Sequence, residues 1–274
     1  MIAVRQRLDE SLVERGLADT RSRARALILA GDVLVNDQPA TRAGMLVSPT
    51  DRIELRERPR FVSRGGEKLA HALEVFGLDV TGWVCADLGA STGGFTDCLL
   101  QAGATRVYAI DVGYGLLDPK LRDDPRVVVM ERTNARYLER LPEPVNLVTI
   151  DVSFISLRLI FPAAARILTP GGWCVPLIKP QFEAGRREVR RGVVRDPAVH
   201  RRVLEEVLEV AAESGFRLLG LTRSPLLGPA GNVEFLACLR LEDRATEGEG
   251  MAEEDDRQLR ERLIKQVLAG EGRE

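Results

Sequence analysis

Apolar and polar positions follow two different patterns along the chain, and the change falls near residue 60. Beyond it, apolar runs of strand length recur between stretches with helical spacing. The expected strands are Trp83–Leu88, Arg106–Val112, Val127–Met130, Leu147–Val152, Trp173–Ile178, Leu218–Thr222 and Glu234–Leu239, with helices over 66–76, 94–102, 156–168 and 197–214. Such alternation is typical of an α/β fold in which helices cover both faces of a parallel sheet. No helix separates the last two strands, so we expect an antiparallel hairpin to close a mostly parallel seven-stranded sheet.

Before residue 60 the elements are shorter. A first helix is expected over 5–18, with Leu8, Leu12 and Val13 on one face. A second helix runs from a cap at Thr20 or Ser22 to Ala30, with Ala24, Leu27 and Ile28 inward and Arg21, Arg23 and Arg25 outward. Strands Val33–Val35 and Ile53–Leu55 follow, with a tight turn at Asn36-Asp37. We therefore predict a small α+β domain over 1–57, a linker over 58–62, the sheet domain over 63–241, and an acidic tail or terminal helix over 242–274.

Charge is distributed unevenly, although the net charge of the 274-residue chain is only −2. Residues 242–274 hold eleven acids and six bases, so the rest of the chain is mildly basic. Within that rest, residues 181–202 hold seven arginines against three acids. A basic body with a local arginine cluster is compatible with a nucleic-acid partner.

Several classes of protein are disfavoured by the same composition. The apolar runs are strand-sized, and the first residues contain no apolar core of signal-peptide length, so we expect a cytoplasmic protein without a membrane partner. The four cysteines are widely spaced, which argues against a zinc site or disulfide framework. The two histidines, His71 and His200, are expected on helix surfaces rather than as metal ligands.

Lysine is rare, because the chain has four lysines and thirty-five arginines. Lysine can be tuned to lose its proton, whereas arginine stays charged. Lys68 follows a Ser-Arg-Gly-Gly-Glu turn, and Lys179 ends an apolar strand just before a proline. These two positions are candidates for acid–base chemistry, although chance could also place two of four lysines near loops.

A glycine-rich turn joins the first strand of the sheet domain to a helix, Gly89-Ala90-Ser91-Thr92-Gly93-Gly94-Phe95. Such a turn holds a nucleotide or cofactor in α/β folds. Ser91 stands where a dinucleotide fingerprint has glycine, and Phe95 stands where a phosphate loop has lysine. These departures weaken a nicotinamide or nucleoside triphosphate site and leave S-adenosylmethionine (SAM) as the third candidate. Asp111 ends the next strand about 20 residues later, where an acid can accept both ribose hydroxyls.

Charged residues cluster where strands of the predicted sheet begin or end. Asp151 and Lys179 end two strands, and Glu234 opens the last strand, which reaches the same edge if it is antiparallel. Lys68, on the preceding helix, could return to that edge. Two lysines and two carboxylates could form a catalytic charge network or a pair of ordinary salt bridges.

The sequence resembles the TlyA, or hemolysin A, family, which is similar to FtsJ-type ribose methyltransferases. The motifs that carry the resemblance are SRGGEKL, DLGASTGGFTD, YAIDVGYGLL, ERTNAR, DVSFISL and LIKPQFEAGR, between residues 63 and 186. The RLDESL start, the TRSRARALI helix and the VLVND strand resemble the RNA-binding domain of small-subunit ribosomal protein four. Together they cover nearly all of residues 5–240.

The resemblance implies a Rossmann-like, SAM-dependent methyltransferase that methylates the 2′-hydroxyl of cytidine in ribosomal RNA, with rRNA or ribosomal subunits as partners and no metal. The family's tetrad carries onto Lys68, Asp151, Lys179 and Glu234. The implied SAM-binding residues are Gly89, Ala90, Ser91, Gly93, Gly94, Phe95, Asp111, Val112 and Asn134. Expected RNA contacts are Arg7, Arg21, Arg23, Arg64, Arg186 and Arg187.

In the expected reaction Lys179 acts as the base, Asp151 and Glu234 hold and orient it, and Lys68 steers the hydroxyl and the developing oxyanion. Two alternatives remain open. The chain could be a non-catalytic RNA-binding or assembly factor, or a membrane-active hemolysin, as the family's historical name suggests.

Overall fold

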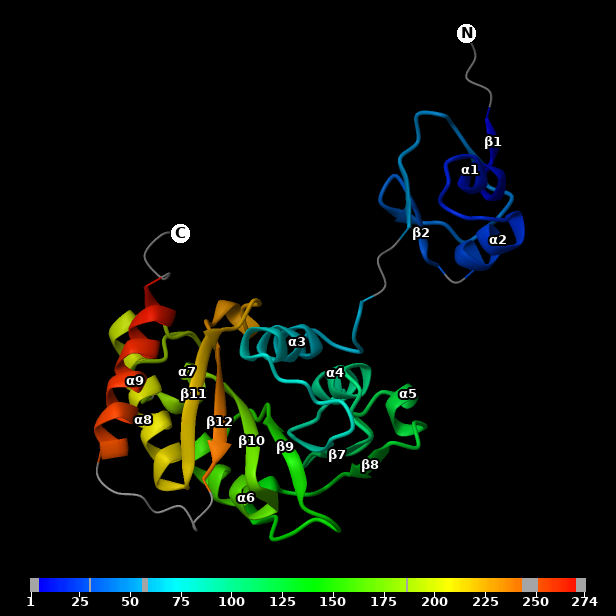
Figure 1. The fold of residues 1–274 in the computed structure, drawn as a ribbon. Coiled ribbons are helices and arrows are strands. Elements are labelled where there is room, and N and C mark those ends of the chain that lie inside the picture. Colours follow the sequence, from blue (N-terminus) through cyan, green and yellow to red (C-terminus); the bar gives the residue numbers. More distant parts are fainter. Residues whose placement is uncertain (1–4, 30, 56–58, 186, 243–250, 270–274) are drawn as a thin grey trace. The chain divides into compact units, whose positions relative to one another are not determined.

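The computed structural model describes residues 5–29, 31–55, 59–185, 187–242 and 251–269, and the chain divides into two compact units, Met1–Pro59 and Arg60–Glu274 (Figure 1). The first unit has two helices and two small antiparallel sheets. Its helices are α1 (Leu8–Glu14) and α2 (Arg21–Leu29), and its strands are β1 (Gln6–Arg7), β2 (Val33–Val35), β3 (Gln38–Pro39), β4 (Leu46–Val47) and β5 (Ile53–Leu55). Strand β1 pairs with β4, and β2 lies between β3 and β5. The core includes fully buried Leu8, Leu12, Ala24 and Ile28.

The first unit confirms the two helices and two of the strands expected from the sequence. Thr20 caps α2, because its hydroxyl accepts from the Arg23 amide at 3.1 Å. Asn36 and Asp37 have φ of 50° and 65°, the left-handed geometry of a tight hairpin turn. The first helix is shorter than expected, and placing Val13 on its inner face is wrong, since that side chain is 36% exposed.

The second unit is a seven-stranded sheet with helices on both faces. Its strands are β6 (Val84–Leu88), β7 (Arg106–Ile110), β8 (Val127–Met130), β9 (Val145–Ile150), β10 (Leu168–Ile178), β11 (Phe216–Arg223) and β12 (Phe235–Leu241). The helices are α3 (Gly65–Phe76), α4 (Gly94–Gln101), α5 (Pro119–Arg122), α6 (Phe161–Ile167), α7 (Pro180–Glu183), α8 (Pro197–Glu213) and α9 (Met251–Leu268), with 3-10 turns at Ala135–Tyr137, Leu157–Leu159 and Pro229–Gly231. The strand order is β11-β12-β10-β9-β6-β7-β8, and β12 alone runs antiparallel to its neighbours. The expected mostly parallel sheet with a closing hairpin is confirmed.

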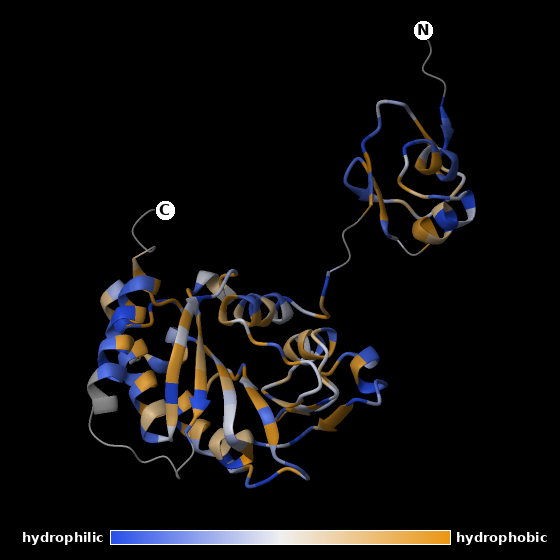
Figure 2. Cartoon of the chain, viewed as in Figure 1, coloured by the Kyte–Doolittle hydropathy of each residue, from blue (hydrophilic) through white to orange (hydrophobic). Residues whose placement is uncertain are grey.

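Successive side chains of the strands enter two separate cores, because neighbouring strand residues point to opposite faces. On β6, Cys85 belongs to the core that contains residues of α3 and α4, whereas Ala86 belongs to the core that contains residues of α6, α8 and α9. Figure 2 shows these strands as largely apolar between helices with mixed surfaces. Phe61, just before α3, is also buried in the first of these cores, beneath Gly66.

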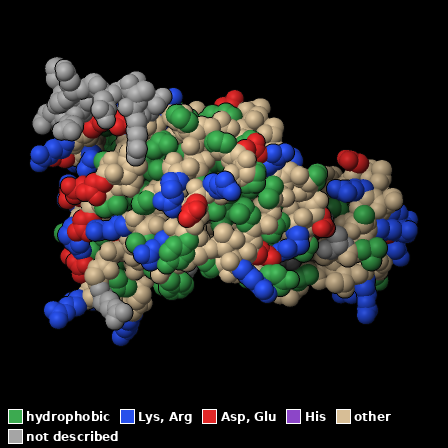
Figure 3. Space-filling view, turned by 90° about the horizontal axis from the view of Figure 1, so that it is seen from below, with side chains coloured by type: hydrophobic (Ala, Val, Ile, Leu, Met, Phe, Trp, Pro, Cys, Tyr) green, Lys and Arg blue, Asp and Glu red, His purple; other side chains and the backbone are tan. Residues whose placement is uncertain are grey.

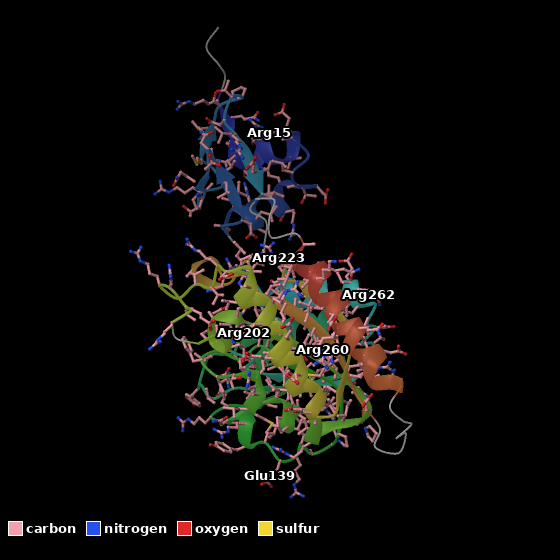
Figure 4. The ribbon with its side chains drawn as sticks, turned by 90° about the vertical axis from the view of Figure 1, so that its left-hand side faces the viewer. Arg15, Glu139, Arg202, Arg223, Arg260 and Arg262 are labelled. Carbon is pink, nitrogen blue, oxygen red and sulfur yellow. The ribbon has the colours of Figure 1, made fainter. Side chains whose placement is uncertain are left out.

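The described residues 251–269 of the C-terminal segment include a docked helix. Helix α9 packs against α8 and β11, with Ile264 fully buried. The Arg217 guanidinium lies 3.0 Å from the Asp256 carboxylate, which ties β11 to α9. Figure 4 faces this side of the sheet and labels Arg202 on α8 and Arg260 on α9.

His200 corrects one expectation. Placing it on a helix surface is wrong, since it is 2% exposed and packs its ring edge against Phe235. Its Nε2 lies 3.2 Å from the Val194 carbonyl oxygen. His71 is half-buried, with Nε2 3.2 Å from the Thr222 hydroxyl.

Candidate active site

Strand register brings three of the four tetrad residues to one edge of the sheet. Ile178 of β10 pairs with Phe235 of β12, so the residues just beyond them, Lys179 and Glu234, are neighbours. Parallel pairing of β6 with β9 places Asp151 directly after the strand next to the glycine turn. Because β12 is antiparallel, its first residue meets the carboxyl ends of the parallel strands, where ligands bind in this class of fold.

The tetrad forms two separate ion pairs. Lys68 of α3 lies 2.5 Å from Glu234 Oε2, and both side chains are at least nine-tenths buried. Lys179 lies 2.7 Å from Asp151 Oδ1 and donates to the Ser153 hydroxyl at 3.0 Å. The Lys179 contact with Asp151 is one of charge, because Oδ1 accepts no aligned hydrogen bond from any described group. No ion pair joins Glu234 to Lys179 among the described residues.

Two polar residues of the site were missed by the sequence reasoning. Ser153 holds Lys179, and the Gln181 amide donates to Glu234 Oε1 at 3.2 Å. Both lie inside the motifs quoted above, within two residues of a tetrad member. That proximity was the signal that could have identified them.

A cavity of about 210 Å³ connects the tetrad to the glycine turn. This tetrad cavity is lined by all four tetrad residues, by Ser63 and Arg64 before α3 and Gly65 at its start, and by Gly89, Ala90, Ser91, Thr92, Gly94 and Phe95. Gly89 has φ of 89°, and a Cβ there would lie 2.7 Å from the Asp151 carbonyl oxygen. Only glycine therefore allows β6 to turn this close to the loop that carries Asp151.

A fully buried acid lies beneath the turn. Asp87 accepts hydrogen bonds from the Thr96 amide at 3.0 Å and hydroxyl at 2.8 Å, and from the Thr149 hydroxyl at 3.2 Å. Burial raises the pKa of Asp87 to about 7, and the nearby charge of Asp151 adds to that increase, while the hydrogen bonds oppose it. Asp87 thus couples the turn to the neighbouring strand β9.

Asp111 lies at the far end of the glycine turn. Its two carboxylate oxygens accept from the Ser91 amide at 2.8 Å and the Gly113 amide at 2.7 Å. A carboxylate has about four acceptor positions, so both oxygens can still accept hydroxyl groups. Ala90, Ser91 and Asp111 line a small adjoining hollow of about 10 Å³.

The remaining residues of the expected cofactor site, Gly93, Val112 and Asn134, do not line the tetrad cavity. Gly93 is the N-cap residue just before α4, and Val112 is 67% exposed beside Asp111. Asn134 lies in another hollow of about 450 Å³ together with Tyr137, and its side chain caps the turn Ala135–Tyr137 by accepting from the Arg136 amide. The structure therefore does not bring Asn134 into the cavity that contains the tetrad.

Three arginines of the first unit surround one buried acid. Asp9 is fully buried, and its carboxylate accepts from Arg7, Arg21 and Arg25 at 2.9–3.1 Å. The hydrogen bond from Arg7 is the largest of the effects that hold the pKa of Asp9 well below its usual range. Arg7 and Arg21 thus carry a structural ion pair, whereas Arg23 is exposed.

The expected RNA contacts of the second unit differ from one another. Arg64 donates to the Leu227 carbonyl at 2.9 Å and lines the tetrad cavity. Arg187 lines a surface hollow of about 840 Å³ with three other arginines, Arg190, Arg191 and Arg195. Arg186 lies outside the described residues. Figure 3 shows acidic and basic side chains beside one another on one face of the molecule.

Two other kinds of site were sought in the described part of the chain. No group of three or more His, Cys, Asp or Glu side chains there is arranged to hold a metal ion. Among the described helices, none combines the length and apolarity needed to cross a membrane.

Comparison with known proteins gives matches to both units. Residues 61–241 match the FtsJ-like methyltransferase family, and residues 6–53 match the S4 domain. A Mycobacterium tuberculosis relative named 16S/23S rRNA (cytidine-2′-O)-methyltransferase TlyA is 46% identical over 95% of this chain and 99% of its own length. Hemolysin A of Brachyspira hyodysenteriae is 43% identical over 84% of this chain and 98% of its own. A solved structure from Streptococcus thermophilus, described as a candidate hemolysin, has a TM-score of 0.70 and 42% identity over 97% of this chain and 95% of that one.

Proposed function

The chain belongs to the FtsJ-like methyltransferase family, and on that premise we propose that it transfers a methyl group from SAM to the ribose 2′-hydroxyl of cytidine in ribosomal RNA. The observation that carries the proposal is the pair of lysine–carboxylate contacts beside a glycine turn. The name of the mycobacterial relative supports the same substrate. Ribosomal RNA as the substrate would place the protein in the cytoplasm.

The residues at the glycine turn fit SAM. The Asp151 backbone approaches Gly89 so closely that a side chain is excluded, and the turn lines the tetrad cavity, in which a ligand can lie against its backbone. Asp111 offers free acceptor positions for ribose hydroxyls, and Ser91 lies in both the tetrad cavity and the hollow beside Asp111. When bound there, SAM supplies an electrophilic methyl group on a cationic sulfur.

Lys179 is the residue best placed to take the proton of the ribose hydroxyl. It lines the tetrad cavity, and Asp151 and Ser153 fix its amine from two directions. In its neutral form the amine can accept the proton as the 2′-oxygen forms its new bond to carbon. Asp151 then stabilises the ammonium that results.

Lys68 has a different role in this scheme. Its partner Glu234 is buried and holds it by a short charge-assisted contact, so Lys68 stays a fixed cation at the cavity wall. A fixed positive charge lowers the energy of the oxyanion that develops on the ribose. Glu234 therefore orients Lys68, whereas Asp151 orients Lys179.

RNA binding is assigned chiefly to the S4-type unit. S4 domains occur in ribosomal proteins, as in the Syntrophotalea carbinolica protein uS4, which is 30% identical over 95 residues. Arg7, Arg21 and Arg23 would contact phosphates, with Arg64 and Arg187 as further contacts beside the reaction site. The target nucleotide would leave its stack to reach the tetrad cavity.

The decisive experiment has two measurements. Isothermal titration of the full chain should show SAM binding that Asp111→Ala weakens and that Asp79→Ala, a surface control, leaves unchanged. Mass spectrometry of rRNA should show a ribose-methylated cytidine only in cells that contain the protein. Binding of NADH or ATP without binding of SAM would refute the cofactor assignment. If ribose methylation of rRNA is the same with and without the protein, a non-catalytic assembly factor is the better explanation.

A further inference from the structure

The single helical turn α7 follows Lys179 directly, and its side chains contact two other parts of the site, Glu234 and the loop after Asp151. It spans Pro180–Glu183, inside the LIKPQFEAGR motif. The proposed reaction uses only Lys179 of that motif. Gln181, Phe182 and Glu183 therefore remain without a role, although each makes a specific contact.

Gln181 holds the oxygen of Glu234 that Lys68 does not contact. The amide Nε2 donates to Glu234 Oε1 at 3.2 Å, while Oε2 lies 2.5 Å from Lys68. The side-chain carbonyl oxygen of Gln181, Oε1, is buried and accepts no hydrogen bond from any described group. Turning the amide over would place this oxygen against the Glu234 carboxylate, so the contact between Nε2 and Oε1 fixes the orientation of the amide.

Space around Glu234 is equally restricted. A Cβ at Gly228 would lie 2.1 Å from Glu234 Oε1, so only glycine leaves room for the carboxylate. Gln181 thus holds Glu234 in the position in which it meets Lys68, and Gly228 leaves the space that this position requires.

Glu183 ties α7 to the loop that follows Asp151. Its carboxylate accepts from the Ser156 hydroxyl at 2.6 Å and from the Leu157 amide at 2.8 Å. Phe182 packs on Phe154 of the same loop, with ring centroids 4.9 Å apart. Burial raises the pKa of Glu183, while the two hydrogen bonds and Arg158 oppose this.

We propose that Gln181 and Glu183 are positioning residues for methyl transfer, Gln181 by fixing Glu234 and Glu183 by fixing the loop that carries Asp151. This inference rests on the proposed function. Neither residue lines the tetrad cavity, so each acts through a residue that does. One short turn then sets the geometry of both ion pairs, and misplacement of about 1 Å can reduce a rate by roughly a hundredfold.

Gln181→Leu tests the proposed role of Gln181. The substitution keeps the bulk of the side chain and removes the donor to Glu234. Single-turnover methyl transfer to rRNA should slow roughly ten- to hundredfold, while the SAM dissociation constant and the KM for RNA stay within about threefold. Gln181→Glu should be slower still, because it brings a carboxylate against Glu234.

Glu183→Ala and Glu183→Gln test the proposed role of Glu183. Alanine removes both hydrogen bonds and should reduce the single-turnover rate about tenfold or more. Glutamine can still accept from the Leu157 amide, so it should restore most of the rate. Glu143→Ala is the control, because Glu143 also accepts two hydrogen bonds, in its case from the Arg106 and Tyr108 side chains, at the amino-terminal end of β7.

Each rate is divided by the concentration of protein that binds SAM, which titration measures. If the wild type is active and Lys179→Ala is not, yet Gln181→Leu and Glu183→Ala keep the wild-type rate, the positioning inference is overturned and the proposed function stands. Activity lost only in proportion to SAM-binding protein also overturns it, because a general packing defect produces that result. A wild type that transfers no methyl group refutes the proposed function itself.

Discussion

Lys68 and Glu234 stand 166 positions apart in the sequence, yet their charged atoms lie 2.5 Å apart inside the second unit. Loss of one partner would leave the other charge buried and uncompensated. The pair therefore bears on folding as well as on the reaction.

Glu234→Ala should destabilise the second unit by about 3–5 kcal/mol, because it leaves Lys68 buried without a partner. The double variant Lys68→Met, Glu234→Leu should recover much of that stability and none of the activity. Urea unfolding followed by circular dichroism measures the first effect and rRNA methylation the second. A single variant as stable as the wild type would show that water reaches the pair freely.

Lys179→Arg should be nearly as inactive as Lys179→Ala while still binding SAM, because arginine supplies no neutral form at working pH. Lys68→Arg should be milder, since a fixed cation tolerates permanent charge. Single-turnover methyl transfer across a pH series gives the comparison, and substantial activity in Lys179→Arg would reduce that residue to a positioning charge.

Asp87 should make the second unit less stable as pH rises from about 4 to 7. Its pKa in the folded protein is raised to about 7, chiefly by burial, so over this range the folded state keeps a proton that the unfolded state has lost. Asp87→Asn should remove this dependence, because an amide does not ionise. Denaturant unfolding at several pH values measures the slope, with Asp79→Asn as an exposed control. Equal slopes in Asp87→Asn and wild type would mean that Asp87 is charged throughout.

Arg23 and Arg21 should differ in what they contribute to the S4-type unit. Arg23→Ala should weaken RNA binding and reduce its salt dependence by about one phosphate contact without changing stability. Arg21→Ala should weaken both, because Arg21 also pairs with Asp9. Binding titrations at several salt concentrations and thermal unfolding separate the two effects, and Arg52→Ala, whose partner is Glu54, is the control. Identical behaviour of the two variants would contradict the structural role of Arg21.

The sheet was predictable because its strands are continuous apolar runs; Val127–Met130 has the expected bounds. The first part of β10 was missed because Pro170 and Gly171 indicate a turn. In the structure Leu168 already pairs with Val145 of β9, and the register shifts between Leu168 and Trp173. Helix α7 was missed because it is one turn long and begins with a proline. His200 could have been placed correctly, since it shares a helical face with Val203, Leu204 and Val207.

At the site, the sequence pattern predicted that Asp151, Lys179 and Glu234 lie at one edge of the sheet, since an antiparallel last strand starts where its parallel neighbours end. Which lysine meets which carboxylate could not be predicted, because that depends on side-chain directions and not on strand order. The contacts of Ser153 and Gln181 could not be predicted for the same reason, since they join side chains 26 and 53 positions apart in the sequence.

The place of β12 in the sheet determines when the protein can become active during its synthesis. This strand lies between β10 and β11, although it is the last of the seven to leave the ribosome. Until residues 235–241 emerge, β10 and β11 have no strand between them, and Lys68 has no counter-charge. The nascent chain therefore carries the glycine turn, Asp151 and Lys179 in an unfinished unit, and the site is completed only after Glu234 and β12 have been synthesised.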